Sequence, residues 1–181
     1  MTHTTVTAAE MKALEKAAND NGLLYIQMME NAGRAAFAQL RRRLPGPARL
    51  LVAAGRGNNG GDGVTCARML HEAGVKVRAF LVGKREKMTP DSKANEQRLN
   101  ACGVQLEDFD PEDVDQHLFT CAAHVVIDAL FGIGLGRDLA GDVVTAVEWI
   151  NESDGIVIAA DIPSGVQANT GCVMGTAVQA D

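Results

Sequence analysis

Apolar residues along the chain form short continuous runs that alternate with stretches of helical spacing. A continuous apolar run bounded by turn residues predicts a strand that is buried on both faces. Such runs lie at residues 49–54, 76–82, 104–106, 124–128 and 156–161. Helices are predicted between them, ending near residue 73, over 89–101, from 110 onward and over 139–152. Repeated strand–helix alternation predicts an α/β domain with a mainly parallel sheet.

Two helices are predicted ahead of the first strand. Thr7 and Glu10 have the spacing of a capping box, which predicts a helix that continues to about Asn19. A second helix follows, and Pro45 and Pro47 are expected to end that segment. Its apolar positions at helical spacing are Ile26, Met29, Ala32, Ala36 and Leu40. Because no linker or internal repeat interrupts the pattern, we expect residues 1–181 to form a single domain.

Composition narrows the classes of function. The chain is 46% hydrophobic, which supplies one well-buried core. Its net charge of −6 argues against a general nucleic-acid binder and against an acidic-membrane binder. The N-terminal residues lack the apolar core of a signal peptide, which favours a cytoplasmic location. The four cysteines are scattered without a CxxC pair and the histidines show no ligand spacing, so neither a disulfide framework nor a zinc site is expected.

Three unusual segments each follow a predicted strand. They are 55–63 (GRGNNGGDG), 128–138 (DALFGIGLGRD) and 161–165 (DIPSG). In an open parallel sheet, ligands bind beyond the carboxyl ends of the strands. We therefore expect these segments to converge on one ligand site.

The first segment has the composition of a phosphate-binding turn. Glycine lets main chain approach a ligand closely, and the following helix start offers free N–H groups and a positive dipole end. Gly55, Gly57 and Gly60 satisfy GxGxxG, but no Walker lysine follows. A side chain at Gly60 or Gly61 is expected to meet the ligand or to force an unfavourable backbone angle. The plainer alternative is an ordinary flexible turn.

Several polar residues of these segments are candidates for chemistry. Asp161 ends a strand at the expected crevice and is the best candidate for acid–base catalysis. Asn59, Asp128 and Ser164 offer oxygen atoms, which suit a hard cation rather than zinc or copper. Arg137 is a candidate phosphate ligand, although a lone arginine is more often solvated. Capping and solvent-facing roles remain the alternatives for the two carboxylates and the serine.

Taken together, the motifs resemble those of the NAD(P)HX epimerase family, also called the YjeF N-terminal domain. The resemblance rests on GRGNNGGDG, VIDALFGIGLGRD and DIPSGVQANTG, and on MMENAG at residues 28–33. It implies a Rossmann-like three-layer αβα sandwich. It also implies an isomerase of cofactor repair, which interconverts the R and S epimers at C6 of hydrated NADH and NADPH so that a separate or fused dehydratase can restore the cofactor.

The resemblance also implies residue roles. Asn59, Asp128 and Ser164 correspond to ligands of a potassium ion, and a homodimer that uses the N-terminal helices is implied. The family continues into another strand and helix, so the chain is expected to stop short of the family's C-terminal end. The residues implied to contact the hydrated nucleotide are Asn58, Asn59, Gly60, Gly61, Asp62, Gly132, Ile133, Gly134, Leu135, Gly136, Arg137, Asp138 and Asp161.

Two other functions remain open on the sequence. An NADP-dependent oxidoreductase would use the GxGxxG pattern, with Lys84 and Arg85 in place of the acidic residue that selects NAD. No hydride-transfer set of side chains accompanies that pattern. A non-catalytic nucleotide-binding or dimerisation domain would keep the fold alone, and the retained carboxylates argue against it. Lys84 is also a weaker candidate for stabilising charge during catalysis.

Overall fold

The computed structural model describes residues 5–42 and 48–181. Five strands form one parallel sheet in the order β3-β2-β1-β4-β5. This confirms the predicted parallel sheet. Strand order reverses between β1 and β4, so the loops after these neighbouring strands diverge and leave room for a ligand. The strands are β1 (Arg49–Gly55), β2 (Lys76–Val82), β3 (Leu106–Asp108), β4 (Val125–Ala129) and β5 (Ile156–Ala159).

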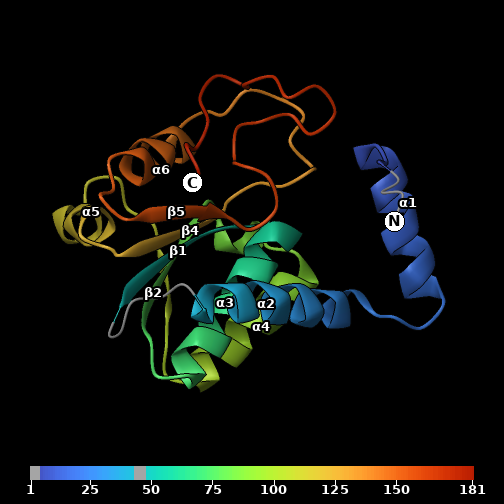
Figure 1. Ribbon diagram of the computed structural model, residues 1–181, viewed down its shortest axis with the longest axis horizontal. Helices are drawn as coiled ribbons and strands as arrows, with labels where there is room; N and C mark the ends of the chain where they lie inside the picture. The colour runs from blue at the N-terminus through green and yellow to red at the C-terminus, as the bar shows by residue number, and fades with distance from the viewer. Residues whose placement is uncertain (1–4, 43–47) are drawn as a thin grey trace.

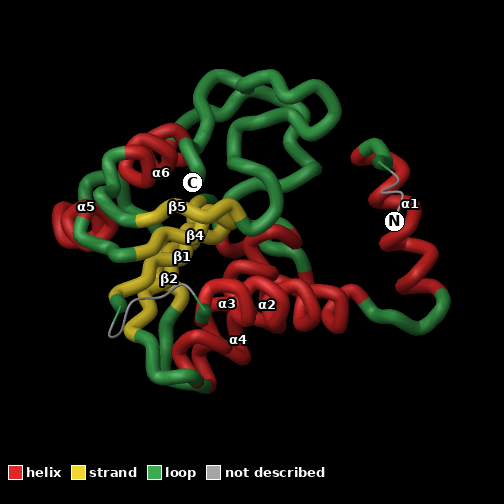
Figure 2. The backbone as a smooth tube through the Cα atoms, viewed as in Figure 1, coloured by secondary structure: helices red, strands yellow, loops and turns green. Residues whose placement is uncertain are grey.

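Helices cover both faces of the sheet and complete the three layers (Figures 1 and 2). One face carries α2 (Tyr25–Arg41), α3 (Asn58–Glu72) and α4 (Pro90–Ala101). The other face carries α5 (Val114–Cys121) and α6 (Asp142–Asn151). A short 3-10 turn, η1 (Arg85–Lys87), links β2 to α4.

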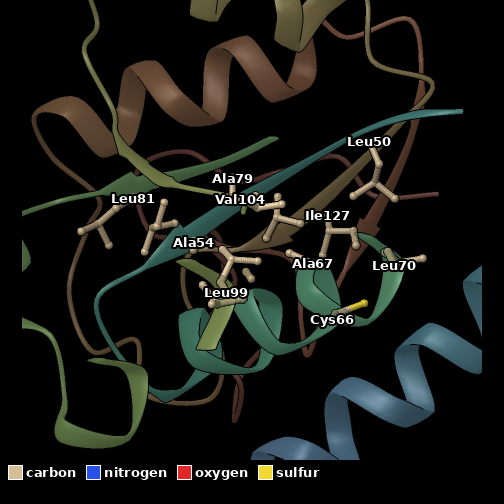
Figure 3. Packing of buried hydrophobic residues seen from close by; sticks show 14 of the residues in the cluster. Leu50, Ala54, Cys66, Ala67, Leu70, Ala79, Leu81, Leu99, Val104 and Ile127 are labelled. Carbon is tan, nitrogen blue, oxygen red and sulfur yellow. The ribbon is translucent and has the colours of Figure 1, made fainter. Parts of the chain in front are cut away.

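The core has two parts, one on each face of the sheet. Side chains of β1, β2 and β4 pack against α3 on the first face, where Leu50, Leu70 and Leu99 are fully buried (Figure 3). On the second face, Phe80, Val126 and Val147 belong to the cluster beneath α5 and α6. Because successive strand residues point to opposite faces, this double covering explains why the strands read as continuous apolar runs.

Helix α1 (Ala8–Asp20) stands apart from the two core layers (Figure 1). Its predicted capping box is present, with Thr7 and Glu10 bonding to each other's main-chain N–H groups. None of its residues is buried, and Met11 and Leu14 are exposed. Pro45 and Pro47, expected to end the second helix, lie outside the described residues. No helix in the described part of the chain combines the length and apolarity needed to cross a membrane.

Some predicted boundaries were wrong by a few residues. The third strand runs over 106–108 rather than 104–106, and the last ends at residue 159 rather than 161. Helix α5 begins after Asp113, whose side chain accepts bonds from the N–H groups of Asp115 and Gln116, and not at residue 110. Helix α6 begins after Gly141, which has a φ of 64°, and not at residue 139. Leu139 belongs to the core cluster, but it lies ahead of the helix.

Candidate functional site

The three glycine-rich segments meet at the carboxyl edge of the sheet, as predicted. A Cβ at Gly55 would lie 2.0 Å from the carbonyl oxygen of Leu130, so the first two segments touch through main chain. Asp161 accepts a 2.9 Å hydrogen bond from the N–H of Ile133, which joins the second segment to the third. These contacts place residues from three distant parts of the chain around one locus.

The first segment is part of a helix rather than a loop. Gly57 is the N-cap of α3, so the NNGG residues form its first turn and Asp62 follows them. The first main-chain bond of that turn runs from the N–H of Gly61 to the carbonyl of Gly57. The preceding N–H groups of Asn58, Asn59 and Gly60 therefore have no partner within the helix and carry its positive dipole end.

The glycines of this turn are required by packing, which corrects the physical reason expected from the sequence. A Cβ at Gly60 would lie 1.7 Å from the carbonyl oxygen of Gly55. A Cβ at Gly61 would lie 2.8 Å from the Met29 sulfur and 2.9 Å from the Ser92 hydroxyl. Neither glycine has a positive φ. Their missing side chains let α3 sit tightly on β1, α2 and α4.

Asp128 and Ser164 form a buried hydrogen-bonded pair. The N–H of Ser164 donates to one carboxylate oxygen of Asp128 at 2.7 Å, and its hydroxyl donates to the other at 2.6 Å. The N–H of Leu130 also donates to this carboxylate, while the N–H of Phe131 donates to the Ser164 oxygen. Burial raises the pKa of Asp128, and these hydrogen bonds oppose that rise. The pair ties the end of β4 to the third segment.

Asp161 follows β5 and keeps its carboxylate exposed at the site. Its Oδ2 accepts from the N–H of Ile133, and a Cβ at Gly132 would lie 2.2 Å from the same oxygen. Gly132 is thus a glycine because the Asp161 carboxylate occupies the space beside it. The second segment therefore fixes the orientation of the group that sequence reasoning selected for acid–base catalysis.

Asp62 has an electrostatic role that sequence reasoning did not assign to it. It lies just after the first turn of α3 and lines an apolar hollow between α2 and the ends of β4 and β5. Burial, followed by the negative charges of Asp161 and Glu15, raises the pKa of Asp62 to about 7. Its pKa thus lies near neutrality beside a second carboxylate, which is the property expected of a proton-transfer group. Sequence pattern carries no signal for this, because burial and the approach of Asp161 both arise from the tertiary fold.

Comparison with known families agrees with this arrangement. Residues 25–181 match the family described as YjeF-related protein N-terminus. The chain belongs to this family. This confirms the resemblance seen in the motifs.

This YjeF-related chain covers most of the length of some relatives and only part of the length of others. An NAD(P)H-hydrate epimerase of Limosilactobacillus fermentum is 35% identical over 182 residues, which cover all of this chain and 84% of that protein. A bifunctional NAD(P)H-hydrate repair enzyme of Thermofilum pendens is 43% identical over 180 residues, which are 96% of this chain but only 33% of that protein. The crystal structure of yeast ynu0 superposes with a TM-score of 0.87 at 22% identity and covers 98% of this chain and 78% of that one. The last comparison shows a shared fold.

The remaining candidate residues of this family member differ in how exposed they are. Leu135 is buried in the core on the α5–α6 face, so only its main chain is free to meet a ligand. Asn59 is partly buried, and its side-chain nitrogen is buried without a hydrogen-bond partner. The others on or beside the surface are Asn58, Gly134, Gly136, Arg137 and Asp138, all exposed.

The basic pair after β2 bears on the oxidoreductase alternative. Lys84 is exposed, whereas Arg85 forms ion pairs with Glu96 and Asp108 and donates to the carbonyl of Leu106. Its guanidinium is thus already engaged within the protein. This weakens its assignment as the reader of a 2′-phosphate.

Proposed function

We propose that this chain is an NAD(P)H-hydrate epimerase that interconverts the R and S epimers of hydrated NADH and NADPH. The proposal is supported by family membership and by relatives named for this activity over most of their own length. The structural observation that carries it is the pairing of Asp62 and Asp161 beside the free N-terminus of α3. A dinucleotide needs an anion site, and epimerisation needs proton transfer, so both requirements meet at one place.

The N-terminal turn of α3 is the proposed anion site for the dinucleotide's phosphates. Its free N–H groups and dipole favour a negatively charged ligand. We propose that residues 132–138 form the opposite wall, where Gly134, Gly136, Arg137 and Asp138 are exposed and Arg137 supplies a charge that no ion pair within the described residues occupies. Asn58, Asp62 and Asp161 complete the proposed contacts.

The two carboxylates suit acid–base chemistry at a carbon that bears both a hydroxyl and a ring nitrogen. In the proposed step, Asp161 accepts the hydroxyl proton while the carbon–oxygen double bond forms. The bond from this carbon to the ring nitrogen breaks, and the nitrogen keeps the electron pair and takes a proton from Asp62. Reclosure on the other face of the carbonyl reverses both transfers and inverts the centre. A pKa of about 7 lets Asp62 hold its proton and release it near neutral pH.

We propose a potassium ion held by Asn59, Asp128 and Ser164. The side-chain amide nitrogen of Asn59 is buried without a hydrogen-bond partner. A rotation of the amide by half a turn exchanges its nitrogen and oxygen, so the oxygen can take this buried position and bind a cation. A carboxylate, a hydroxyl and an amide oxygen form a donor set for a hard cation. Such an ion would supply positive charge beside the buried Asp128 carboxylate and hold the first and third segments together.

We further propose a homodimer that uses α1, together with a dehydratase that acts on the S epimer, fused or separate. An exposed helix without buried residues, carrying Met11 and Leu14 on its surface, supports the dimer. The names of relatives described as bifunctional repair enzymes support the link to a second activity. Equilibrium sedimentation of the chain and of its Leu14→Glu variant tests the dimer, which the variant should weaken.

The deciding experiment is an epimerisation assay in which each purified epimer of hydrated NADH and NADPH is incubated with the protein. Separation of the epimers by chromatography should show each converted to a mixture far faster than in buffer. Binding of the hydrates without interconversion would instead indicate a non-catalytic nucleotide-binding domain. A change at the nicotinamide absorbance band with added alcohols would indicate the oxidoreductase.

A further inference from the structure

Three side chains with different metal-binding atoms meet on the α5–α6 face. His117, Cys121 and Glu152 each offer one ligand atom, and these atoms all lie within 4.8 Å of one another. The His117 Nε2 and a carboxylate oxygen of Glu152 are 2.9 Å apart. Ligand atoms around a tetrahedral zinc ion are about 3.3–3.8 Å apart, given its bond lengths. The three atoms are therefore close to the separation that one ion requires.

The fold presets this arrangement. His117 and Cys121 are four residues apart on α5, so their side chains project from the same face of the helix. Glu152 is the C-cap of α6 and approaches from the neighbouring helix. The His117 ring packs on the Trp149 ring with centroids 4.6 Å apart, which limits its rotation. Only small side-chain adjustments are needed to bring the three atoms to a common centre.

The position separates this group from the epimerase site. Cys121 comes four residues before β4, and Glu152 four residues before β5. They therefore lie at the amino edge of the parallel sheet, whereas Asp128 and Asp161 lie at or beyond its carboxyl edge. The His117 and Glu152 side chains are 37% and 58% exposed, so an ion can reach them from solvent.

The absence of a CxxC pair and of histidine ligand spacing argues against a zinc site built from cysteines alone or histidines alone. The helical spacing of His117 and Cys121 is a mixed pair, and its third member comes from another helix. An imidazole, a thiolate and a carboxylate form a donor set that zinc accepts, whereas magnesium and calcium prefer oxygen alone. We propose that His117, Cys121 and Glu152 bind a zinc-type divalent ion, with water completing its coordination.

Binding displaces the Cys121 thiol proton to solvent and replaces the direct His117–Glu152 hydrogen bond with a shared ion. The ion would link α5 to α6 at the amino edge of the sheet. Its expected effect is to stabilise the folded chain, because the unfolded chain does not hold the three ligands together.

Cobalt is the probe that tests this site, since it reports a thiolate ligand through a near-ultraviolet charge-transfer band. The untagged chain is titrated with cobalt(II), and the fluorescence of Trp149, the chain's single tryptophan, is followed in parallel. The band should saturate at about one equivalent with quenching of Trp149, and zinc should abolish the band by displacing cobalt. Cys121→Ser should remove the band, and His117→Gln and Glu152→Gln should each weaken binding at least about tenfold.

The matched control is Cys102→Ser, because Cys102 lies after α4 on the opposite face of the sheet. This variant should keep the band, the stoichiometry and the quenching. Zinc at a hundredfold excess over its dissociation constant should raise the melting temperature of the parent and the control by about 5–10 °C, but not that of Cys121→Ser. No band in the parent at millimolar cobalt, or a band undiminished in folded Cys121→Ser, would overturn the proposal. If Cys121→Ser does not fold, unchanged cobalt affinity in folded His117→Gln and Glu152→Gln would overturn it equally.

Discussion

The hydroxyl of Ser164 donates a 2.6 Å hydrogen bond to the Asp128 carboxylate, although the two residues are 36 positions apart. The N–H of Ser164 binds the other oxygen of the same carboxylate. Both residues are buried, so water cannot replace a lost partner. This pair makes the second and third glycine-rich segments parts of one structure.

Ser164→Ala should lower the free energy of unfolding by about 1–3 kcal/mol, because it leaves the buried Asp128 carboxylate with fewer donors. At about 2–4 °C per kcal/mol, the loss is measurable by thermal unfolding. Ser153→Ala is a suitable control, since the Ser153 hydroxyl accepts a single main-chain bond in a partly buried loop. Equal losses in the two variants would contradict the special role of the Asp128–Ser164 pair.

Asp62→Asn should change the pH dependence of stability. The Asp62 pKa is raised from 3.8 to about 7 in the folded protein, so the folded chain retains a proton there that the unfolded chain releases. Stability from this group is fully present below the unfolded pKa of 3.8, and it is lost progressively as pH rises from there to about 7. Asparagine cannot ionise, so the variant should gain much more melting temperature relative to the parent at about pH 8 than at about pH 4, where the penalty has barely begun.

Glu112→Gln is the control for this measurement, because Glu112 is exposed and its side chain makes no hydrogen bond within the described residues. It should show no comparable pH-dependent gain. The Asp62→Asn variant should also lose epimerase activity. If the melting temperatures of Asp62→Asn and the parent change with pH in the same way, Asp62 ionises as an ordinary carboxyl group.

Asp161→Asn should reduce epimerisation by about 10²–10⁴ while the chain remains folded, as expected for loss of a general acid–base group. The measurement is the rate of interconversion of purified epimers, with circular dichroism to confirm the fold. Activity within about twofold of the parent would remove Asp161 from the mechanism.

Gly132→Ala should impair the reaction without touching a carboxylate. Its new methyl group would lie 2.2 Å from the Asp161 Oδ2, so the carboxylate must move away from the N–H of Ile133. We expect kcat to fall, because the proposed proton-transfer group is displaced. Unaltered kcat would show that the orientation set by the second segment does not matter for catalysis.

Gly61→Val should destabilise the fold by about 1–3 kcal/mol through overpacking against Met29 and Ser92. Gly57→Ser is the control, since a Cβ at Gly57 meets no atom within 4 Å and serine is a favourable N-cap. Thermal unfolding of the two variants tests this. A Gly61→Val protein as stable as Gly57→Ser would show that packing against Met29 and Ser92 does not require a glycine at this position.

The sequence pattern predicted the architecture well, because strands buried on both faces of a parallel sheet consist of continuous apolar residues. The strands from Arg49 and Lys76 were found as continuous apolar runs, and the capping box at Thr7 predicted α1. Boundaries failed where a local contact decided them. The Asp113 cap of α5 is an example, because the earlier Asp110–Pro111 pair looks equally suited to open a helix.

The candidate site was predictable in position but not in physical detail. Strand-end placement was enough to bring Asp128, Asp161 and the NNGGD turn together. It could not show that Gly61 faces Met29, because that contact depends on how α2 crosses α3. Nor could it separate the electrostatic surroundings of Asp62 from those of other carboxylates, since they depend on tertiary packing.

The hydrogen bonds from Ser164 to Asp128 and from Ile133 to Asp161 also bear on the kinetics of recognition. They are internal to the protein, so the segments they join are already held together before any ligand binds. Binding of the proposed nucleotide should therefore cost little conformational entropy of the chain, because few loop residues need to become ordered. Association should accordingly follow a single bimolecular phase whose rate grows linearly with nucleotide concentration, with no plateau from a slow closing step.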